Sequence, residues 1–338
     1  MKTSKTRASL SIICEIASAH GGSADSIQKL LSAANSTNAD WVKIQIYNFD
    51  NLIARGNDNF SELKDIELHP KEWLNVIHYV ATLRIRLIVE VFDFPSLRLI
   101  ESEEAVDAYK IPNSDITHKD FVDAIFSQGK PVFVSIGGAT LREIDAIVEH
   151  GSLFPNVELT LIHGIQSFPT RIEDSSLDKI HSLRERYDCA VGYADHVDAE
   201  YTEISRTIPA MAIAAGASVI EKHLTLDRSE KGYDYYSALN PTEFSEFVNH
   251  LRMLLPAIGS QGLENLTDAE TTYRNKMKKF AVLSEPASKG TKVEKARVVY
   301  RRTEELGLTK NDVESKYFEK LLIKDLPADT VLNEDHFE

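Results

Sequence analysis

Short apolar runs of strand length recur eight times along residues 10–225, and a segment of helix length follows each of them. The runs are rich in β-branched residues, which is typical of buried strands. They lie at residues 10–17, 41–47, 86–93, 108–113, 131–137, 157–165, 190–196 and 218–225. The helix-like segments lie at residues 23–38, 70–84, 95–104, 118–128, 140–150, 173–187, 201–215 and 241–258. The pattern therefore predicts eight consecutive strand–helix units.

Eight such units over about 250 residues match the size of a closed (β/α)8 barrel, the TIM barrel. The alternative, an open doubly wound sheet, usually has fewer strands and a glycine-rich phosphate turn after the first one. Here the first strand is followed by "AHGGS" at residues 19–23, which lacks the GxGxxG spacing. The pattern thus favours an α/β fold of the TIM-barrel type.

The pattern changes after the eighth unit. Residues 261–275 are polar and lack apolar periodicity, so we expect a linker there, after a barrel domain at residues 1–260. Residues 276–338 contain a weak internal repeat, because "KGTKVEKARV" at 289–298 resembles "ADTVLNEDHF" at 328–337. This repeat predicts a small second domain of few short strands with internal pseudo-symmetry.

Polar side chains stand near the ends of the predicted strands. The carboxyl ends of the strands form the active-site face of TIM barrels, so these side chains are candidates for chemistry. In the last strand, Glu221 and His223 share one face and Lys222 takes the other. We expect Glu221 to bridge to a cation inside the barrel and Lys222 to point towards the helices. The strand-end residues are Glu15, Lys43, Gln45, Glu90, Lys110, Ser135, His163, His196 and His223.

Two histidines and two lysines suggest a metal and an anion. His196 and His223 end consecutive strands, and neighbouring strands lie only about 4.8 Å apart. Both imidazoles can then reach one divalent ion, with Glu15 or a water completing its shell. Lys43 and Lys110 can hold a phosphate or a carboxylate as point charges.

Charge and cysteine content limit the partners. A net charge of −14 argues against nucleic acid or an anionic membrane as the main partner. Cys14 and Cys189 have no CxxC partner, which favours a reduced, cytoplasmic setting over a disulfide framework. We also expect no segment that spans a membrane, because no apolar stretch is long enough.

Six segments of the predicted barrel and the last residues of the chain carry a resemblance to a known family. The barrel segments are "IICEIASAHGG" (12–22), "DWVKIQIY" (40–47), "AYKIPNSDIT" (108–117), "GKPVFVSIGGATLREI" (129–144), "GYADH" (192–196) and "GASVIEKHLTLDR" (216–228). They resemble, in order, the sialic acid (N-acetylneuraminate) synthase family, whose relatives include legionaminate and pseudaminate synthases and spore-coat polysaccharide proteins. The last residues, "KDLPADTVLNEDHFE" (324–338), are similar to the antifreeze-like (SAF) domain that follows the barrel in that family, so the resemblance covers nearly the whole chain.

The resemblance implies condensation of phosphoenolpyruvate with an open-chain sugar aldehyde, giving a 2-keto-3-deoxy sugar acid and phosphate for surface polysaccharide biosynthesis. It implies a divalent cofactor, Mn²⁺ or Mg²⁺, on His196 and His223. It also implies a domain-swapped homodimer whose small domain closes the partner's barrel. The roles it implies are catalytic for Glu15, Asp115 and Lys110; phosphoenolpyruvate-binding for Lys43, Lys110, Asn113, Ser135 and Gln166; and sugar-binding for Gln45, Glu90, Phe168, Asp234 and Arg302.

The chain departs from the family pattern at neutral hydrogen-bonding positions. Glu90 stands where the family has a threonine that contacts phosphoenolpyruvate, and Phe168 replaces a tyrosine. We expect Glu90 to contact Lys43, Lys110 or the sugar. Two other functions stay open at this point. One is a pyruvate aldolase that forms a Schiff base on Lys110, and the other is a barrel that binds a sugar without turnover.

Overall fold

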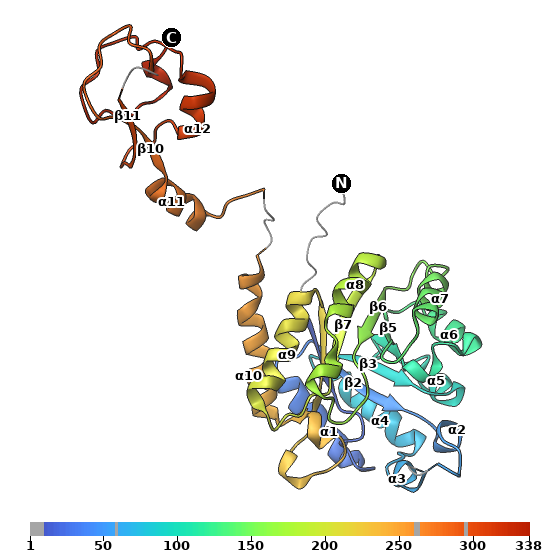
Figure 1. The fold of residues 1–338 in the computed structure, drawn as a ribbon. Helices are drawn as coiled ribbons and strands as arrows, with labels where there is room; N and C mark the ends of the chain where they lie inside the picture. The colour runs from blue at the N-terminus through green and yellow to red at the C-terminus, as the bar shows by residue number, and fades with distance from the viewer. Residues whose placement is uncertain (1–9, 58–59, 260–263, 294–296) are drawn as a thin grey trace. The chain divides into compact units, whose positions relative to one another are not determined.

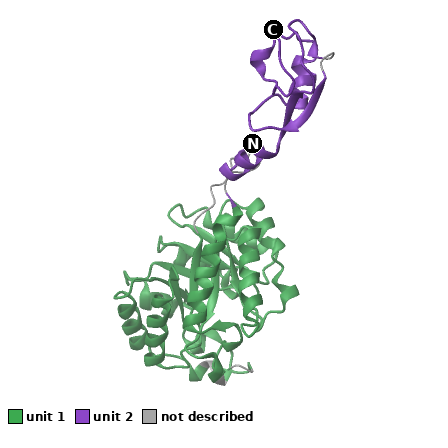
Figure 2. Ribbon diagram, turned by 90° about the vertical axis from the view of Figure 1, so that its left-hand side faces the viewer, with its two compact units in different colours: residues 1–258 green, residues 259–338 purple. Residues whose placement is uncertain are grey.

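The protein forms two compact units, residues 1–258 and residues 259–338 (Figure 2). The structure is a computed structural model that describes residues 10–57, 60–259, 264–293 and 297–338. Each unit has its own apolar core within these residues. The first unit carries all but one of the candidate site residues, and the exception is Arg302.

The first unit is a closed barrel of eight parallel strands, which confirms the predicted TIM barrel. The strands are hydrogen-bonded in sequence order, and pairing of β1 with β8 closes the ring. Every strand lies inside its predicted run. The strands are β1 (Ser11–Glu15), β2 (Trp41–Ile46), β3 (Arg86–Val91), β4 (Ala108–Ile111), β5 (Val132–Ser135), β6 (Leu159–His163), β7 (Ala190–Asp195) and β8 (Val219–Leu224).

Helices surround the barrel strands (Figure 1). Several begin at side chains that cap their free backbone N–H groups. Ser23 caps α1, while Glu72 and Glu243 complete capping boxes at α4 and α10, both of which start at a proline. The helices are α1 (Ala24–Ser36), α4 (Pro70–Val80), α5 (Phe94–Ile100), α6 (Lys119–Phe126), α7 (Leu141–Gly151), α8 (Asp178–Arg186), α9 (Thr202–Ala215) and α10 (Pro241–Leu254).

The connections at the carboxyl ends of two strands are longer than the others. The segment between β2 and α4 holds the short helices α2 (Phe49–Leu52) and α3 (Phe60–Asp65). The segment between β8 and α10 returns to the barrel through β9 (Ala238–Leu239), which pairs with β8. Both segments therefore add walls to the rim of the barrel on the same side, around β1, β2 and β8.

The barrel interior is apolar at its floor and charged above it. The guanidinium group of Arg86 lies 3.5 Å from the centre of the Trp41 ring at the start of β2 and β3. Such inward-facing residues alternate along each strand with residues that pack under the helices. The apolar floor consists of Ile13, Trp41, Ile88, Ala108, Phe133, Ile162, Ala194 and Val219.

The second unit is built on an antiparallel pair, β10 (Lys279–Leu283) and β11 (Val298–Arg302). The predicted internal repeat is visible in its hydrogen bonds. The Gly290 N–H donates to the Leu322 carbonyl at 2.7 Å, and in the second copy the Asp329 N–H donates to the Leu283 carbonyl at 2.7 Å. Gly290 and Asp329 both have positive φ angles, 79° and 63°. The short helical elements of this unit are α12 (Lys310–Asp312), a π turn at Val313–Tyr317 and a 3-10 turn at Glu334–His336.

The segment predicted to be a linker is partly helical. Helix α11 (Asp268–Met277) begins at Thr267, whose hydroxyl forms a capping box with Glu270. All residues of α11 are exposed, so no apolar periodicity could reveal the helix. Residues 261–263 of the predicted linker lie outside the described residues.

Candidate active site

Five charged side chains form a buried cluster inside the barrel, above its apolar floor. The Lys43 ammonium nitrogen lies 2.7 Å from Glu90 Oε2 and 3.1 Å from Glu221 Oε1, and it also contacts Glu15. The Lys110 ammonium nitrogen donates to both oxygens of Glu221, at 2.7 and 2.9 Å. All five side chains are at most 3% exposed. Two ammonium groups face three carboxylates, which leaves the cluster with a formal charge of 2 − 3 = −1.

Barrel closure assembles this cluster. Glu221 lies on β8, whereas its two lysine partners lie on β2 and β4, neither of which pairs with β8. The ion pairs therefore cross the lumen. The structure confirms that Glu221 bridges to cations inside the barrel and that Glu90 contacts Lys43. Glu90 Oε2 also accepts a hydrogen bond of 3.0 Å from the Gln45 side chain.

Lys110, Glu90 and Glu221 stabilise one another's charges, whereas burial outweighs the carboxylates at Lys43 and lowers its pKa. Burial by itself would lower the pKa of Lys110, but the carboxylates of Glu221 and Glu90 outweigh it and raise this pKa above its usual value. Burial would likewise raise the pKa of Glu90 and of Glu221, but Lys110 and Lys43 lower both. Glu90 is thus held as a carboxylate, and Lys110 as an ammonium group.

Two histidine rings lie at the mouth of the barrel. The centres of the His196 and His223 rings are 5.3 Å apart, and the Phe168 ring lies 4.9 Å from the first and 5.8 Å from the second. Burial lowers the pKa of His196 to about 4 and that of His223 well below its usual value. Both imidazoles are therefore neutral at pH 7, which is the form that binds a metal.

The donor atoms of these histidines fit a metal ion. His196 Nδ1 lies 2.9 Å from the Ile165 carbonyl oxygen. A carbonyl only accepts, so Nδ1 carries the proton and Nε2 keeps its lone pair for a ligand. His223 Nδ1 is buried and has no hydrogen-bond partner among the described residues, although it lies 3.9 Å from Asp234 Oδ2.

Both carboxylate oxygens of Glu15 have partners within the protein. Its Oε1 accepts a hydrogen bond of 2.6 Å from the Ala17 N–H, and its other oxygen contacts Lys43. No group of three or more histidine, cysteine, aspartate or glutamate side chains within the described part of the chain is placed to hold a metal. Of the two alternatives for completing the shell, this arrangement favours water.

The other predicted site residues of the first unit, apart from His163, lie around the same mouth. Ser135 is buried at the end of β5, and the side-chain oxygen of Asn113 has no hydrogen-bond partner among the described residues. Asp115 Oδ2 accepts a hydrogen bond of 2.7 Å from Ser114, while Gln166 and Phe168 are exposed on the loop after β6. Arg302 lies on β11 of the second unit.

His163 is not part of the mouth, which corrects the prediction made from its strand-end position. Its Nε2 lies 2.9 Å from the Ser175 carbonyl, and its ring lies beside Tyr193 in the outer core. The inward-facing residue of β6 is Ile162. Residues alternate between the two faces of a strand. A polar residue at a strand end therefore faces the barrel interior only if it is an even number of positions away from another inward-facing residue.

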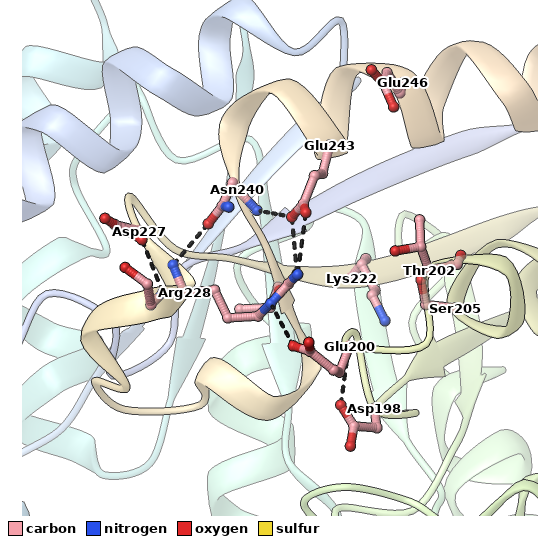
Figure 3. Close-up of polar contacts among 12 residues, drawn as sticks. Asp198, Glu200, Thr202, Ser205, Lys222, Asp227, Arg228, Asn240, Glu243 and Glu246 are labelled. Atoms are coloured by element: carbon pink, nitrogen blue, oxygen red, sulfur yellow. Dashed lines mark hydrogen bonds and ion pairs between the residues drawn. The ribbon is translucent and has the colours of Figure 1, made fainter.

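Asp234 lies on the rim segment that follows β8. Arg228 holds this segment through the contacts drawn in Figure 3. The Arg228 guanidinium group donates to both carboxylate oxygens of Glu243, at 2.9 and 3.2 Å, and its backbone N–H donates to Asn240. Asp234 in turn accepts a hydrogen bond of 3.2 Å from the Ser18 N–H. These contacts place the Asp234 carboxylate beside His223.

Two residues near the site were missed by the sequence reasoning. Tyr47 directly follows β2, two positions beyond Gln45, and its ring packs edge-on against Phe92 at 6.1 Å. Its hydroxyl group is buried without a hydrogen-bond partner among the described residues. Asp195 forms an ion pair with Lys222 on the outer face of the barrel, as the predicted direction of Lys222 requires. The alternation of side chains along a strand is the one sequence signal that could have found these two residues.

A closed barrel with buried lysines and two neutral histidines at its carboxyl mouth has the form of a (β/α)8 enzyme. The chain belongs to the NeuB family, whose model matches residues 30–262.

Named relatives are synthases of acidic sugars. The chain is 31% identical to the pseudaminic acid synthase of Campylobacter jejuni, over 81% of this chain and 84% of that protein. It is 27% identical to the N,N'-diacetyllegionaminic acid synthase of the same species, over 82% and 86%. The crystal structure of the sialic acid synthetase of Leptospira borgpetersenii superposes with a TM-score of 0.72 at 27% identity, covering 80% of this chain and 92% of that one. No helix within the described residues combines the length and apolarity that crossing a membrane requires.

Proposed function

We propose that this protein condenses phosphoenolpyruvate with an open-chain sugar aldehyde to give a 2-keto-3-deoxy sugar acid and phosphate. Membership of the NeuB family and the names of its relatives support this reaction. The observation that carries it is the buried pair of lysines directly below two neutral histidines. That pair suits an anionic donor beside an electrophile that a metal activates.

The chemistry forms one carbon–carbon bond and exchanges the carbon–oxygen bond to phosphate for one to water. The enol carbon of phosphoenolpyruvate attacks the aldehyde carbon, and the aldehyde oxygen takes up a proton to become a hydroxyl group. One water then adds to the resulting cation at the second carbon and loses both its protons, one balancing the new hydroxyl group and one leaving with phosphate, as the ketone forms. Lys43 and Lys110 would hold the anionic donor, while Asp115 is the candidate acid or base for the proton transfers.

His196 and His223 would hold the divalent ion, Mn²⁺ or Mg²⁺. Bound there, the ion would polarise the aldehyde carbonyl. It would also change the formal charge of the site from −1 to +1, since two positive charges are added to the cluster of three carboxylates and two ammonium groups. An anionic donor would then meet a site of opposite charge.

The reaction is tested by release of phosphate when phosphoenolpyruvate and Mn²⁺ are mixed with a panel of aldoses, followed by mass spectrometry. The panel should contain sugars with and without 2-acetamido groups. We expect N-acetylmannosamine to be a poor substrate, because Phe168 and Glu90 alter the contacts of the family pattern. No keto acid from any aldose would instead favour a barrel that binds a sugar without turnover.

The contacts of Lys110 argue against a Schiff-base aldolase. A Schiff-base lysine must lose its proton before it attacks a carbonyl. Two hydrogen bonds to Glu221 and a raised pKa keep Lys110 protonated. Borohydride treatment in the presence of pyruvate should therefore leave no adduct on Lys110. A trapped adduct would instead support the function as a Schiff-base aldolase.

Glu90 should weaken the binding of phosphoenolpyruvate. Two like charges about 4 Å apart repel by about 4 kcal/mol at an effective dielectric of 20. Glu90→Thr removes the carboxylate, and Lys43 keeps its contacts with Glu15 and Glu221. In calorimetry without a sugar, we expect the variant to bind phosphoenolpyruvate at least about tenfold more tightly.

Turnover of the native sugar should fall in the same Glu90→Thr variant, because Glu90 Oε1 has no partner among the described residues and is free for a sugar hydroxyl. The control is Glu173→Gln, which removes one exposed negative charge from the same unit. Unchanged or weaker phosphoenolpyruvate binding in Glu90→Thr would contradict the assigned repulsion.

We expect the protein to be a homodimer in which the second unit closes the partner's barrel. A small domain buries too little surface to be very stable alone. Large apolar side chains of this unit are also exposed, namely Leu306, Phe318, Leu321 and Ile323. Light scattering at micromolar concentration should give about twice the chain mass of 37.9 kDa. A mass equal to one chain would rule out the dimer.

A further inference from the structure

A buried ion pair lies directly behind the two mouth histidines, on the outer face of the barrel. The Lys222 ammonium nitrogen is 2.6 Å from Asp195 Oδ2, and both side chains are fully buried, with 0% exposure. Asp195 and Lys222 are opposite each other in the pairing of β7 with β8. Each of them immediately precedes a histidine in the sequence. The ion pair therefore joins β7 and β8 at their last paired position, directly before His196 and His223.

Lys222 contacts the residues on both sides of His196. Besides the Asp195 carboxylate, its ammonium group reaches the Val197 carbonyl oxygen at 3.5 Å. The carbonyl of His196 itself accepts hydrogen bonds from Ser237 Oγ at 2.7 Å and from the Thr170 N–H at 2.8 Å. The backbone around His196 is thus held in place by Lys222, a side chain of β8, the strand that also carries His223.

Stability alone is a weak reason for such a pair. A buried ion pair can often be replaced by apolar residues of similar volume with no loss of stability, because burying two charges costs about as much as their attraction returns. An apolar pair, however, would leave the Val197 carbonyl without the ammonium group and would fix no distance between β7 and β8. The pair is therefore suited to positioning.

We propose that Asp195 and Lys222 are positioning residues that set the separation of His196 and His223 for a shared divalent ion. Neither side chain faces the lumen, so neither touches the substrates or the ion. The inference rests on the metal role of the histidines in the proposed function. Beyond that role, metal affinity would depend on an ion pair that does not touch the metal. Residues behind the ligands of other metal sites affect metal affinity in the same way.

The test separates positioning from stability by comparing Lys222→Met with the double variant Asp195→Leu/Lys222→Met. The single variant leaves Asp195 buried and unpaired, so its urea midpoint should fall; the double variant should recover it. Mn²⁺ affinity, measured by titration of free Mn²⁺ with electron paramagnetic resonance, should remain lowered about 10- to 100-fold in the double variant. If the double variant does not fold, Asp195→Asn replaces it, with a weaker loss of Mn²⁺ affinity expected.

A matched control removes a charge pair between two of the surrounding helices. Asp145 and Arg186 form a bidentate pair at 2.8–2.9 Å on the helices, and both are half-exposed. The variant Asp145→Asn/Arg186→Met should leave Mn²⁺ affinity unchanged. A stable double variant at Asp195 and Lys222 with wild-type Mn²⁺ affinity would overturn the positioning role alone. If the wild-type protein binds no Mn²⁺, both the proposed metal site and the positioning role of Asp195 and Lys222 are wrong.

Discussion

Replacing either His196 or His223 with alanine is expected to abolish metal-dependent turnover while the barrel stays folded. Both imidazoles are neutral, and His196 presents an unprotonated Nε2, so each variant removes one of two protein ligands. A metal that polarises a carbonyl is worth several kcal/mol. A loss of about 4 kcal/mol would slow turnover about a thousandfold.

The control for this experiment is His163→Asn. His163 is also a buried histidine at a strand end, but its ring lies outside the barrel against the Ser175 carbonyl. This variant should lose some stability and keep its affinity for Mn²⁺. Full activity of His196→Ala or His223→Ala in chelator-treated buffer would show that the histidines do not serve a metal.

Replacing Glu221 with leucine should lower the free energy of unfolding of the barrel by about 3–5 kcal/mol. Glu221 makes two hydrogen bonds to Lys110 and one to Lys43, all in the barrel interior. The variant would leave the Lys110 ammonium group buried without its direct carboxylate partner. Urea unfolding of the variant and of the wild type would measure the difference.

A second substitution and a surface control sharpen this test. Glu221→Leu/Lys110→Met removes both charges and should recover most of the lost stability, because the Lys110 ammonium group is then no longer buried without its carboxylate partner. Glu173→Gln breaks an exposed pair with Arg171 and should change the stability by less than about 0.5 kcal/mol. If the free energy of unfolding of Glu221→Leu lay within about 1 kcal/mol of the wild-type value, the ion pair between Glu221 and Lys110 would not be essential for stability.

Strand and helix positions in the barrel followed closely from the apolar pattern, because that pattern reflects burial on one or both faces of each element. The same reasoning placed Glu221 inside and Lys222 outside. It failed for His163, whose strand-end position was read without its phase. It also missed helix α11, because an exposed helix held by a capping box has no apolar stripe.

Several features of the candidate site depend on barrel closure. Glu221 meets Lys43 and Lys110 only because β8 faces β2 and β4 across the lumen. The tautomer of His196 depends on a carbonyl of the β6–α8 loop. No local pattern encodes such contacts, since they join residues far apart in the chain.

By itself, the sequence determined the eight strand–helix units, the end of the barrel that bears the polar residues, and the face of each strand on which they lie. These follow from periodicities of two and about 3.6 residues, which are local properties of strands and helices. Only the tertiary structure decided which charges neutralise one another, that Lys110 and Lys43 hold Glu90 as a carboxylate, and that Asp195 pairs with Lys222 behind the histidines. The energies of those contacts depend on burial and on distances across the closed barrel, which exist only after folding.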